Sequence, residues 1–314
     1  MDRQAETITV IARRPNVSQS RSTATATDPS LLQQQLARWN RGRLALGKPG
    51  GDWREGLAEE HRMRLLEGEW IEAYRREVAE RAAEAPTEPD AFVAWFETLQ
   101  QTGPGQGDPL FPWLAEQASM DDFRWFLTQE AAGEAGFDDL VAFTQVKMPT
   151  RAKLELARNY WDELGRGRED AMHGPMLSQL ATALELRPTD EDTVWEAHAL
   201  ANLLVALAAN RRYTYQSIGA LGAVELTAPG RSACVNAGLQ RLGFGMPVRR
   251  YYAVHATLDV KHSEAWNREV LRPLVEADPR VARPIAEGAL MRLNAGARCF
   301  ERYRRELGLV LPRA

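Results

Sequence analysis

One short stretch restricts the local structure of this chain more than any other. His255, Asp259 and His262 form an H-x-x-x-D-x-x-H pattern inside a segment with helical periodicity. An α-helix turns by about 100° per residue, so offsets of four and seven bring these three side chains within roughly 60° of one another. Two imidazoles and a carboxylate on one helical face suit a divalent transition metal such as iron, manganese or zinc. We therefore predict a metal-binding helix, in preference to a solvated polar stripe or a buried, hydrogen-bonded histidine.

Most of the chain has the same helical periodicity, and no segment of useful length alternates as a strand does. The strongest break is the Gly- and Pro-rich segment from Thr102 to Pro109. Residues 1–29 lack a sustained apolar period and predict a disordered arm. Residues 30–107 predict an N-terminal helical extension, and residues 108–314 a helical bundle. The fold class predicted from the pattern is all-α.

Helix boundaries follow from capping residues and from breaks in the pattern. Asp28 precedes the first helix, Asp90 is placed to cap the third, and Ser119 to cap the helix that carries Phe123. The predicted helices beyond the linker cover residues 138–146, 151–164, 173–186, 192–210, 214–227, 231–242, 248–276 and 279–307.

Composition excludes several classes of protein. The 314 residues are 44% hydrophobic and 26% charged, as in an ordinary globular protein, and the net charge of −4 offers no basic surface for nucleic acid. The longest apolar run, residues 199–209, is too short to span a membrane. Two cysteines form no disulfide framework, and no signal-peptide core is visible near the N-terminus. These features predict a cytoplasmic protein that binds neither nucleic acid nor membranes.

Other residues are candidates to complete the metal site. Asp170 and His173 are three positions apart and would share a helical face, with Glu163 near that face if the helix is continuous. Glu225 lies in an otherwise apolar, small-residue helix, where a buried carboxylate needs a cation or strong donors. A buried salt bridge to Arg231 is the alternative interpretation of Glu225.

The remaining polar candidates have weaker patterns. His198 is more typical of a core histidine or of one that supports a ligand, and His61 lies in a charged helix and is expected to be exposed. Glu130 and Glu134 rank below the other acids as ligands. Arg211 and Arg212 could pair with a substrate carboxylate, although a solvated helix end explains them equally well.

Taken in order, Glu163, Asp170-x-x-His173, Glu225 and His255-x-x-x-Asp259-x-x-His262 resemble the haem-oxygenase-like diiron oxidases, the iron-containing redox enzyme family. The resemblance covers roughly residues 108–307. It implies a haem-oxygenase-like bundle in which three core helices hold two irons (Fe2+/Fe3+) without haem, with O2 as co-substrate. Several family members have a carboxylate seven residues before the His, where this chain has Arg166. Asp170, three residues before it, is more similar to the N-oxygenases and the alkene-forming decarboxylase.

The resemblance implies N-oxygenation of a small amine or amino-acid-derived metabolite in a biosynthetic pathway. It places His173 and His262 on one iron, His255 and Asp259 on the other, and Glu225 between them. Either Glu163 or Asp170 would supply the remaining carboxylate. It also admits an external electron donor and a homodimer as partners. Oxidative C–C cleavage or desaturation of an amino or fatty acid at the same site, and a non-catalytic metal-binding or interaction protein, are the alternatives.

Overall fold

The computed structural model describes residues 28–47, 52–134 and 136–309, and every regular element within these ranges is helical. The longer elements are α1 (Pro29–Leu44), α2 (Leu57–Ala83), α3 (Pro89–Thr102), α4 (Leu110–Glu116), α5 (Met120–Gly133), α6 (Phe137–Thr144), α7 (Thr150–Glu163), α8 (His173–Ala183), α9 (Trp195–Ala209), α10 (Thr214–Arg241), α11 (Met246–Trp266), α12 (Arg272–Ala277) and α13 (Ala282–Glu306). The short turns are η1 (Gly165–Gly167), η2 (Glu169–Ala171), η3 (Arg211–Tyr213), η4 (Asn267–Leu271) and η5 (Pro279–Val281). The predicted all-α class is confirmed. The predicted arm lies outside the described residues, apart from its last two.

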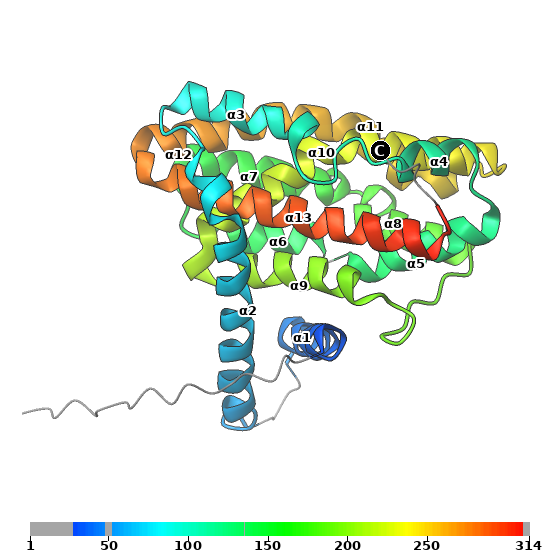
Figure 1. Ribbon diagram of the computed structural model, residues 1–314, viewed down its shortest axis with the longest axis horizontal. Coiled ribbons are helices and arrows are strands. Elements are labelled where there is room, and N and C mark those ends of the chain that lie inside the picture. The colour runs from blue at the N-terminus through cyan, green and yellow to red at the C-terminus, as the bar shows by residue number, and fades with distance from the viewer. Residues whose placement is uncertain (1–27, 48–51, 135, 310–314) are drawn as a thin grey trace, which may run out of the picture.

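Helix α10 is the central element of the bundle. It packs against α11, α13, α4 and α9, and these helices run along the long axis of the molecule (Figure 1). Two clusters of buried apolar side chains form the core, one mainly around Leu207, Leu221 and Leu290 and the other around Phe123 and Tyr303. None of the helices in the described ranges combines the length and apolarity needed to cross a membrane.

Helix α10 is longer than predicted, because it continues through Pro229 instead of ending near Thr227. A proline inside a helix has no N–H to donate, and the interruption costs about 3 kcal/mol. The carbonyl that loses its partner here is that of Glu225, four residues earlier. The packing of α10 against α11 and α13 offsets this cost. Tertiary packing therefore overrides the local break.

Two glycines let α10 and α13 approach closely. A methyl group on Gly219 would overlap the carbonyl oxygen of Ile285, and one on Gly288 would overlap the carbonyl oxygen of Gln216. The two contacts are reciprocal, so each glycine faces the backbone of the other helix. The α10–α13 contact therefore depends on the absence of a side chain at both positions.

We expect Gly219→Ala to lower the free energy of unfolding by about 2 kcal/mol or more, because two packed helices must separate to admit the methyl group. Gly230→Ala is the matched control in the same helix, since a Cβ at Gly230 would meet no atom within 4 Å. It should leave stability unchanged or raise it by up to about 1 kcal/mol. Thermal denaturation of both variants measures the difference, and equal midpoints would contradict the close-contact interpretation.

The helix that carries the His255 pattern ends earlier than predicted. Residues 248–276 were expected to form one helix, but α11 gives way at Asn267 to the π-helical turn η4 and then to α12. Pro273 near the start of α12 favours this break, because a proline ring does not fit within an uninterrupted series of helical hydrogen bonds. π-Turns of this kind occur often beside functional sites.

The predicted caps are largely confirmed. The Asp28 carboxylate accepts a hydrogen bond from the backbone N–H of Ser30, and Ser119 forms a capping box with Asp122. At the third helix Glu88, rather than Asp90, is the capping residue, because α3 already begins at Pro89. Proline is favoured at the first position of a helix, which explains the earlier start.

The N-terminal extension shares the core of the bundle. Phe92, Phe96 and Leu99 of α3 are buried in the same cluster as residues of α10 and α13. Helix α2 lies against α13 near its C-terminal end and projects away from the bundle toward its N-terminus (Figure 1).

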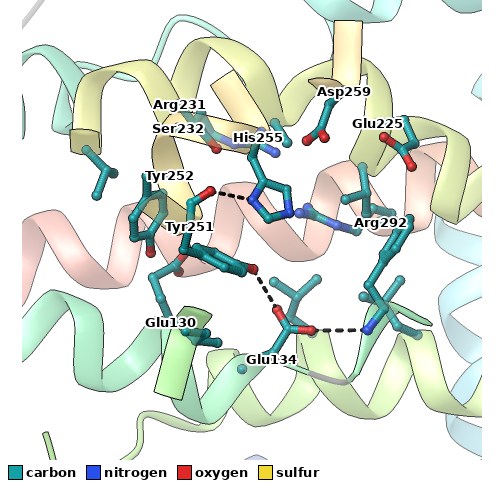
Figure 2. A pocket seen from close by; sticks show the side chains of 18 of the residues that line it. Glu130, Glu134, Glu225, Arg231, Ser232, Tyr251, Tyr252, His255, Asp259 and Arg292 are labelled. Carbon is teal, nitrogen blue, oxygen red and sulfur yellow. Dashed lines mark hydrogen bonds between the residues drawn. The ribbon is translucent and has the colours of Figure 1, made fainter. Parts of the chain in front are cut away.

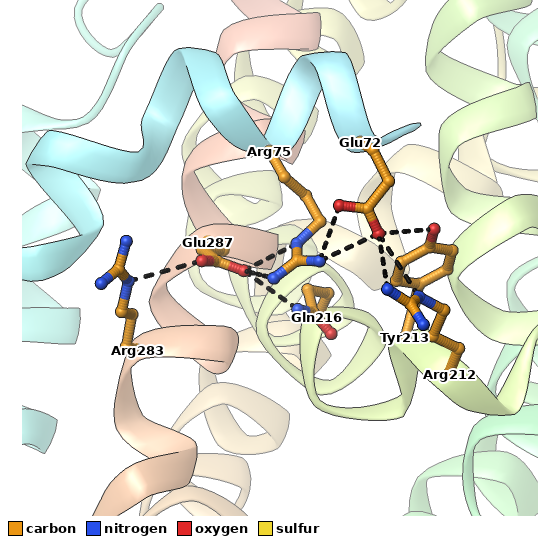
Figure 3. Close-up of polar contacts among 7 residues, drawn as sticks. All are labelled: Glu72, Arg75, Arg212, Tyr213, Gln216, Arg283 and Glu287. Carbon is orange, nitrogen blue, oxygen red and sulfur yellow. Dashed lines mark hydrogen bonds and ion pairs between the residues drawn. The ribbon is translucent and has the colours of Figure 1, made fainter. Parts of the chain in front are cut away.

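A polar network fixes α2 to the bundle (Figure 3). The carboxylate of Glu287 on α13 accepts hydrogen bonds from Arg75 Nε at 2.9 Å and from Gln216 Nε2 at 3.0 Å. The carboxylate of Glu72 on α2 accepts one from the Tyr213 hydroxyl at 3.0 Å. Because Glu287 is 5% exposed, its charge needs these donors.

Candidate metal centre

Four helices bring their polar side chains together inside the bundle. α11 contributes His255, Asp259 and His262, while α10 contributes Glu225. Glu163 is the last residue of α7, and His173 is the first residue of α8. Six of the seven predicted ligands therefore lie in one region, although they come from segments up to 99 residues apart in the sequence.

The six side chains include two groups with metal-binding geometry. In the first group, single ligand atoms of Glu163, His173 and His255 all lie within 4.8 Å of one another. His173 Nδ1 is 2.6 Å from Glu163 Oε2, and the rings of His173 and His255 have centroids 4.5 Å apart. The imidazoles thus converge on one carboxylate.

The second group comprises Glu163, Glu225 and His262, again within 4.8 Å of one another. His262 Nδ1 is 3.5 Å from Glu225 Oε2. Glu163 belongs to both groups, so it lies between them. The resemblance had placed Glu225 between the irons and had paired His173 with His262, whereas the structure groups His173 with His255.

Neighbouring side chains hold these groups in place. Asp162 Oδ2 is 3.1 Å from His262 Nε2, which leaves Nδ1 directed at Glu225. Asn159 Nδ2 donates to Glu225 Oε1 at 2.5 Å. His255 Nδ1 donates to the carbonyl oxygen of Tyr251 at 2.7 Å, which leaves Nε2 available to a metal. Such partners fix the tautomer and orientation of ligands.

Sequence reasoning missed Asn159 and Asp162. Asn159 lies three positions before Asp162 and four before Glu163, so it shares a face of α7 with each of them, in a helix whose other buried residues include Leu156. A polar stripe at the end of an amphipathic helix was therefore a usable signal.

Burial dominates the electrostatics of the centre. Burial, and then the charge of Glu225, raise the pKa of Glu163 well above its ordinary value. Burial, and then the charges of Glu225 and Glu163, raise the pKa of Asp259 to about 10. Burial lowers the pKa of His173 and of His255 to about 4, with a neighbouring imidazole as the second cause in each case. Without metal, the centre therefore favours the neutral forms of Glu163, Asp259, His173 and His255.

Several buried atoms of the centre lack a hydrogen-bond partner among the described residues. They are His173 Nδ1, His262 Nδ1 and Asp259 Oδ1. The His173 nitrogen is close to a carboxylate oxygen, yet the pair does not have hydrogen-bond geometry. Unsatisfied buried nitrogen and oxygen atoms cost free energy unless a further group pairs with them. Divalent cations bound at the two groups would give nitrogen and carboxylate oxygen atoms of this kind partners, so the residues present fit a metal centre.

Asp259 occupies a distinct position. It is 2% exposed and lines the same cavity as His255, but it belongs to neither three-residue group. Repulsion from Glu163 and Glu225 opposes its ionisation in the absence of a cation.

Asp170 lies outside the centre. Its side chain is 75% exposed and is 3.7 Å from Arg168 and 3.8 Å from Arg250. The expected i, i+3 relation to His173 fails because the chain leaves the helix, with positive φ at Gly165, Arg166 and Gly167. Since η2 ends at Ala171 and α8 begins at His173, the two residues do not share a helical face.

The other candidates lie elsewhere. His198 is buried with Nε2 3.4 Å from the carbonyl oxygen of Asp190, and His61 is exposed, as predicted.

Glu225 forms no ion pair with Arg231 in the described part of the chain, so that alternative interpretation is wrong. Arg211 donates to backbone carbonyls at and just after the C-terminal end of α6, and Arg212 contacts Glu72 at the surface.

A cavity of about 160 Å³ adjoins the metal-binding groups. Figure 2 shows His255, Asp259 and Glu225 along one side of it, with Glu130 and Glu134 opposite. Apolar side chains from both core clusters complete the wall, among them Phe111, Leu140, Leu204, Val235 and Phe300. The cavity therefore lies where the two cores meet, directly against the centre.

An all-helical bundle with carboxylate and imidazole groups of this kind defines a class of metal-dependent helical proteins. The sequence model of the iron-containing redox enzyme family matches residues 124–297, which include every residue of the two groups. The chain belongs to this family, and its bundle is haem-oxygenase-like. Membership makes the protein an oxidoreductase that uses iron. A comparison with curated proteins gives no match.

Proposed function

We propose that this protein is a non-haem diiron oxygenase. The observation that supports it is the pair of overlapping groups, Glu163–His173–His255 and Glu163–Glu225–His262, which share one carboxylate. Two irons held in this way, when bound, supply open positions for O2 activation. Glu163, which belongs to both groups, would help to hold each ion, and Asp259 would add a further carboxylate once the metal charge offsets the repulsion from its acidic neighbours.

The protein's own groups prepare the centre for this role. Asp162 and the carbonyl of Tyr251 hold the two imidazoles of α11 in fixed tautomers, and Asn159 orients Glu225. Apolar side chains such as Leu140, Leu204 and Val235 line part of the cavity and limit the access of water to the reacting groups.

We further propose that the reaction is N-oxygenation of a small amine or amino-acid-derived metabolite. The acidic side chains Glu130 and Glu134 line the cavity, and carboxylates on its walls favour a substrate with an amino group. The contact of Glu134 Oε2 with the Tyr251 hydroxyl, at 3.3 Å, holds that carboxylate on the side facing His255 (Figure 2).

The test begins with anaerobic Fe(II) loading, followed by 18O2 in the presence of a panel of small amines and amino acids. We expect O2 consumption and a hydroxylamine, nitroso or nitro product that carries the label. Release of a one-carbon fragment or ammonia would instead establish C–C cleavage, and an unlabelled alkene would establish desaturation. Stable iron binding without any O2 consumption would overturn the oxygenase proposal in favour of a non-catalytic metal protein.

A further inference from the structure

The cavity beside the metal-binding groups holds two arginines that the proposed metal centre does not use. Arg231 is on α10 and Arg292 is on α13, and both line the cavity. Arg292 is only 8% exposed. Arginine is rarely buried to this extent without a paired anion, because its charge loses hydration.

Neither guanidinium has such an anion. Among the described residues no carboxylate oxygen lies within 4.0 Å of either group. Arg292 Nε and Nη1 and Arg231 Nη1 are buried without any hydrogen-bond acceptor in the described ranges. The charge of Glu130 acts on both arginines and that of Asp259 on Arg231, but neither acid in the described part of the chain comes within ion-pair distance of them. Three donors on two adjacent cations are therefore unsatisfied.

The fold nevertheless holds both side chains in place. Arg231 Nη2 donates to Thr227 Oγ1 at 3.0 Å, and its guanidinium lies 5.5 Å from the ring centre of Phe300. On α13, a Cβ at Gly296 would come within 2.7 Å of Arg292 Nη1, so the glycine makes room for that guanidinium. Burial, and then the nearby Arg292 charge, lower the pKa of Arg231 to about 9. The charges are thus positioned at a cost in free energy.

We propose that Arg231 and Arg292 bind the carboxylate group of the substrate. Two guanidinium groups present a set of N–H donors that matches the two oxygens of a carboxylate. A carboxylate between them would satisfy the orphaned donors and neutralise the excess positive charge. The acidic side of the cavity then faces the amino group of the same molecule.

The size of the cavity limits the rest of the substrate. Its volume of about 160 Å³ is close to that of a protein cavity that holds one benzene molecule, on the order of 150 Å³. Apolar side chains, among them Leu140, Leu204 and Val235, also line the cavity. The substrate class is therefore a small amino acid with a compact apolar side chain, rather than a long-chain fatty acid.

This inference takes the cavity to be the substrate site of the proposed oxygenase, so its test measures binding without O2 chemistry. Mn(II)-loaded protein is titrated by calorimetry with L-leucine, 4-methylpentanoate, L-leucinamide, 3-methylbutylamine and dodecanoate. We expect the two small carboxylates to bind at least tenfold more tightly than the amide and the amine, and dodecanoate not to bind. Equal affinity for the amide and the carboxylate, or no binding of either small carboxylate, would overturn the proposal.

Arg231→Met and Arg292→Met provide the second readout. Each should weaken 4-methylpentanoate binding at least tenfold while raising, or leaving unchanged, the melting temperature of the ligand-free protein. An unpaired buried charge is replaced by an apolar side chain in each variant, whereas a purely structural arginine would lose stability. Arg212→Met is the control, since Arg212 is 68% exposed and is not part of the cavity. A lower melting temperature with unchanged binding would contradict the assignment.

Loss of oxygenation would be a separate result. If small carboxylates bind through the two arginines but no oxygenated product forms, the binding assignment holds and the proposed function fails. If an amine without a carboxylate is oxygenated efficiently, the oxygenase proposal holds and the arginine assignment fails.

Discussion

Glu163→Gln is expected to abolish binding of both metal ions. The Glu163 carboxylate is common to both groups, and its Oε2 lies 2.6 Å from His173 Nδ1. A glutamine of the same shape is neutral and turns an N–H donor toward one of the metals. Loss of an outer partner of a ligand already costs 10–100-fold in affinity, so loss of a shared ligand should cost at least about 100-fold at each position. Metal analysis after anaerobic Mn(II) or Fe(II) loading measures the stoichiometry.

Three further variants test whether the loss of both metals is specific to Glu163. Glu225→Gln and His255→Ala each remove a ligand from only one group, so we expect one metal to remain in each. Asp170→Asn alters an acid of the same motif that is 75% exposed, and it should retain both metals. If Asp170→Asn lost metal while Glu163→Gln kept both, the structural placement of the upstream acid would be refuted.

The folded protein should tolerate the Glu163→Gln change. In the metal-free state, burial raises the pKa of Glu163 well above its ordinary value, so the neutral form is already favoured. A neutral amide at this position removes a titratable group that costs stability when it ionises. Loss of metal from this variant would therefore report on ligation rather than on unfolding.

The α11 part of the centre could be predicted from the sequence because its geometry is local. Offsets of four and seven place His255, Asp259 and His262 on one face of any α-helix, whatever surrounds it. The structure contains that helix, and Asp259 and His262 are buried. The isolated Glu225 was equally informative, since a carboxylate in an apolar segment must find a partner.

The prediction that Asp170 shares a helical face with His173 failed for the opposite reason. Its spacing from His173 has meaning only if the helix is continuous, and three successive residues with positive φ end the helix before Asp170. Two of these residues are Gly165 and Gly167, which accept that conformation without strain. The glycines therefore indicated a turn, and the i, i+3 relation should not have been assumed across it.

Partners from different helices could not be predicted at all. The sequence does not show that Asp162 approaches His262 across 100 positions, or that Arg231 and Arg292 share one cavity. The pairing of His173 with His255 also depends on how α8 packs against α11. Only the packing of α7, α8, α10, α11 and α13 places these groups together.

The metal-free protein is expected to lose stability as the pH rises from 7 to 9, and metal is expected to prevent this loss. Asp259, Glu163 and His262 all have folded-state pKa values above their unfolded values. For His262, burial acts to lower the pKa, but the nearby carboxylates of Glu225 and Asp162 outweigh it and raise the pKa to about 9. A group whose pKa is higher in the folded than in the unfolded state stabilises the fold fully at pH values below its unfolded-state pKa. This stabilisation is lost as the pH rises through the folded-state pKa.

The two other imidazoles act in the acidic range. The pKa values of His173 and His255 are lowered to about 4. Their contribution to the free energy of unfolding is therefore fully present above about pH 6.5 and is lost as the pH falls toward 4. Between pH 7 and 9 they remain neutral and do not interfere. Among the residues of the metal centre, the alkaline loss of stability therefore belongs to the two carboxyl groups and His262.

Thermal denaturation of the metal-free and the Mn(II)-loaded protein at pH 7, 8 and 9 measures the effect. Each proton held only by the folded state is worth about 1.4 kcal/mol per pH unit, so the metal-free midpoint should fall by about 5 °C or more. Metal holds the same groups deprotonated, so the loaded protein should not show this fall, and metal binding at pH 7.5 should release protons. A metal-free midpoint that is constant or rises over this range would mean that these groups ionise without cost, and the buried acidic centre would then need no cation.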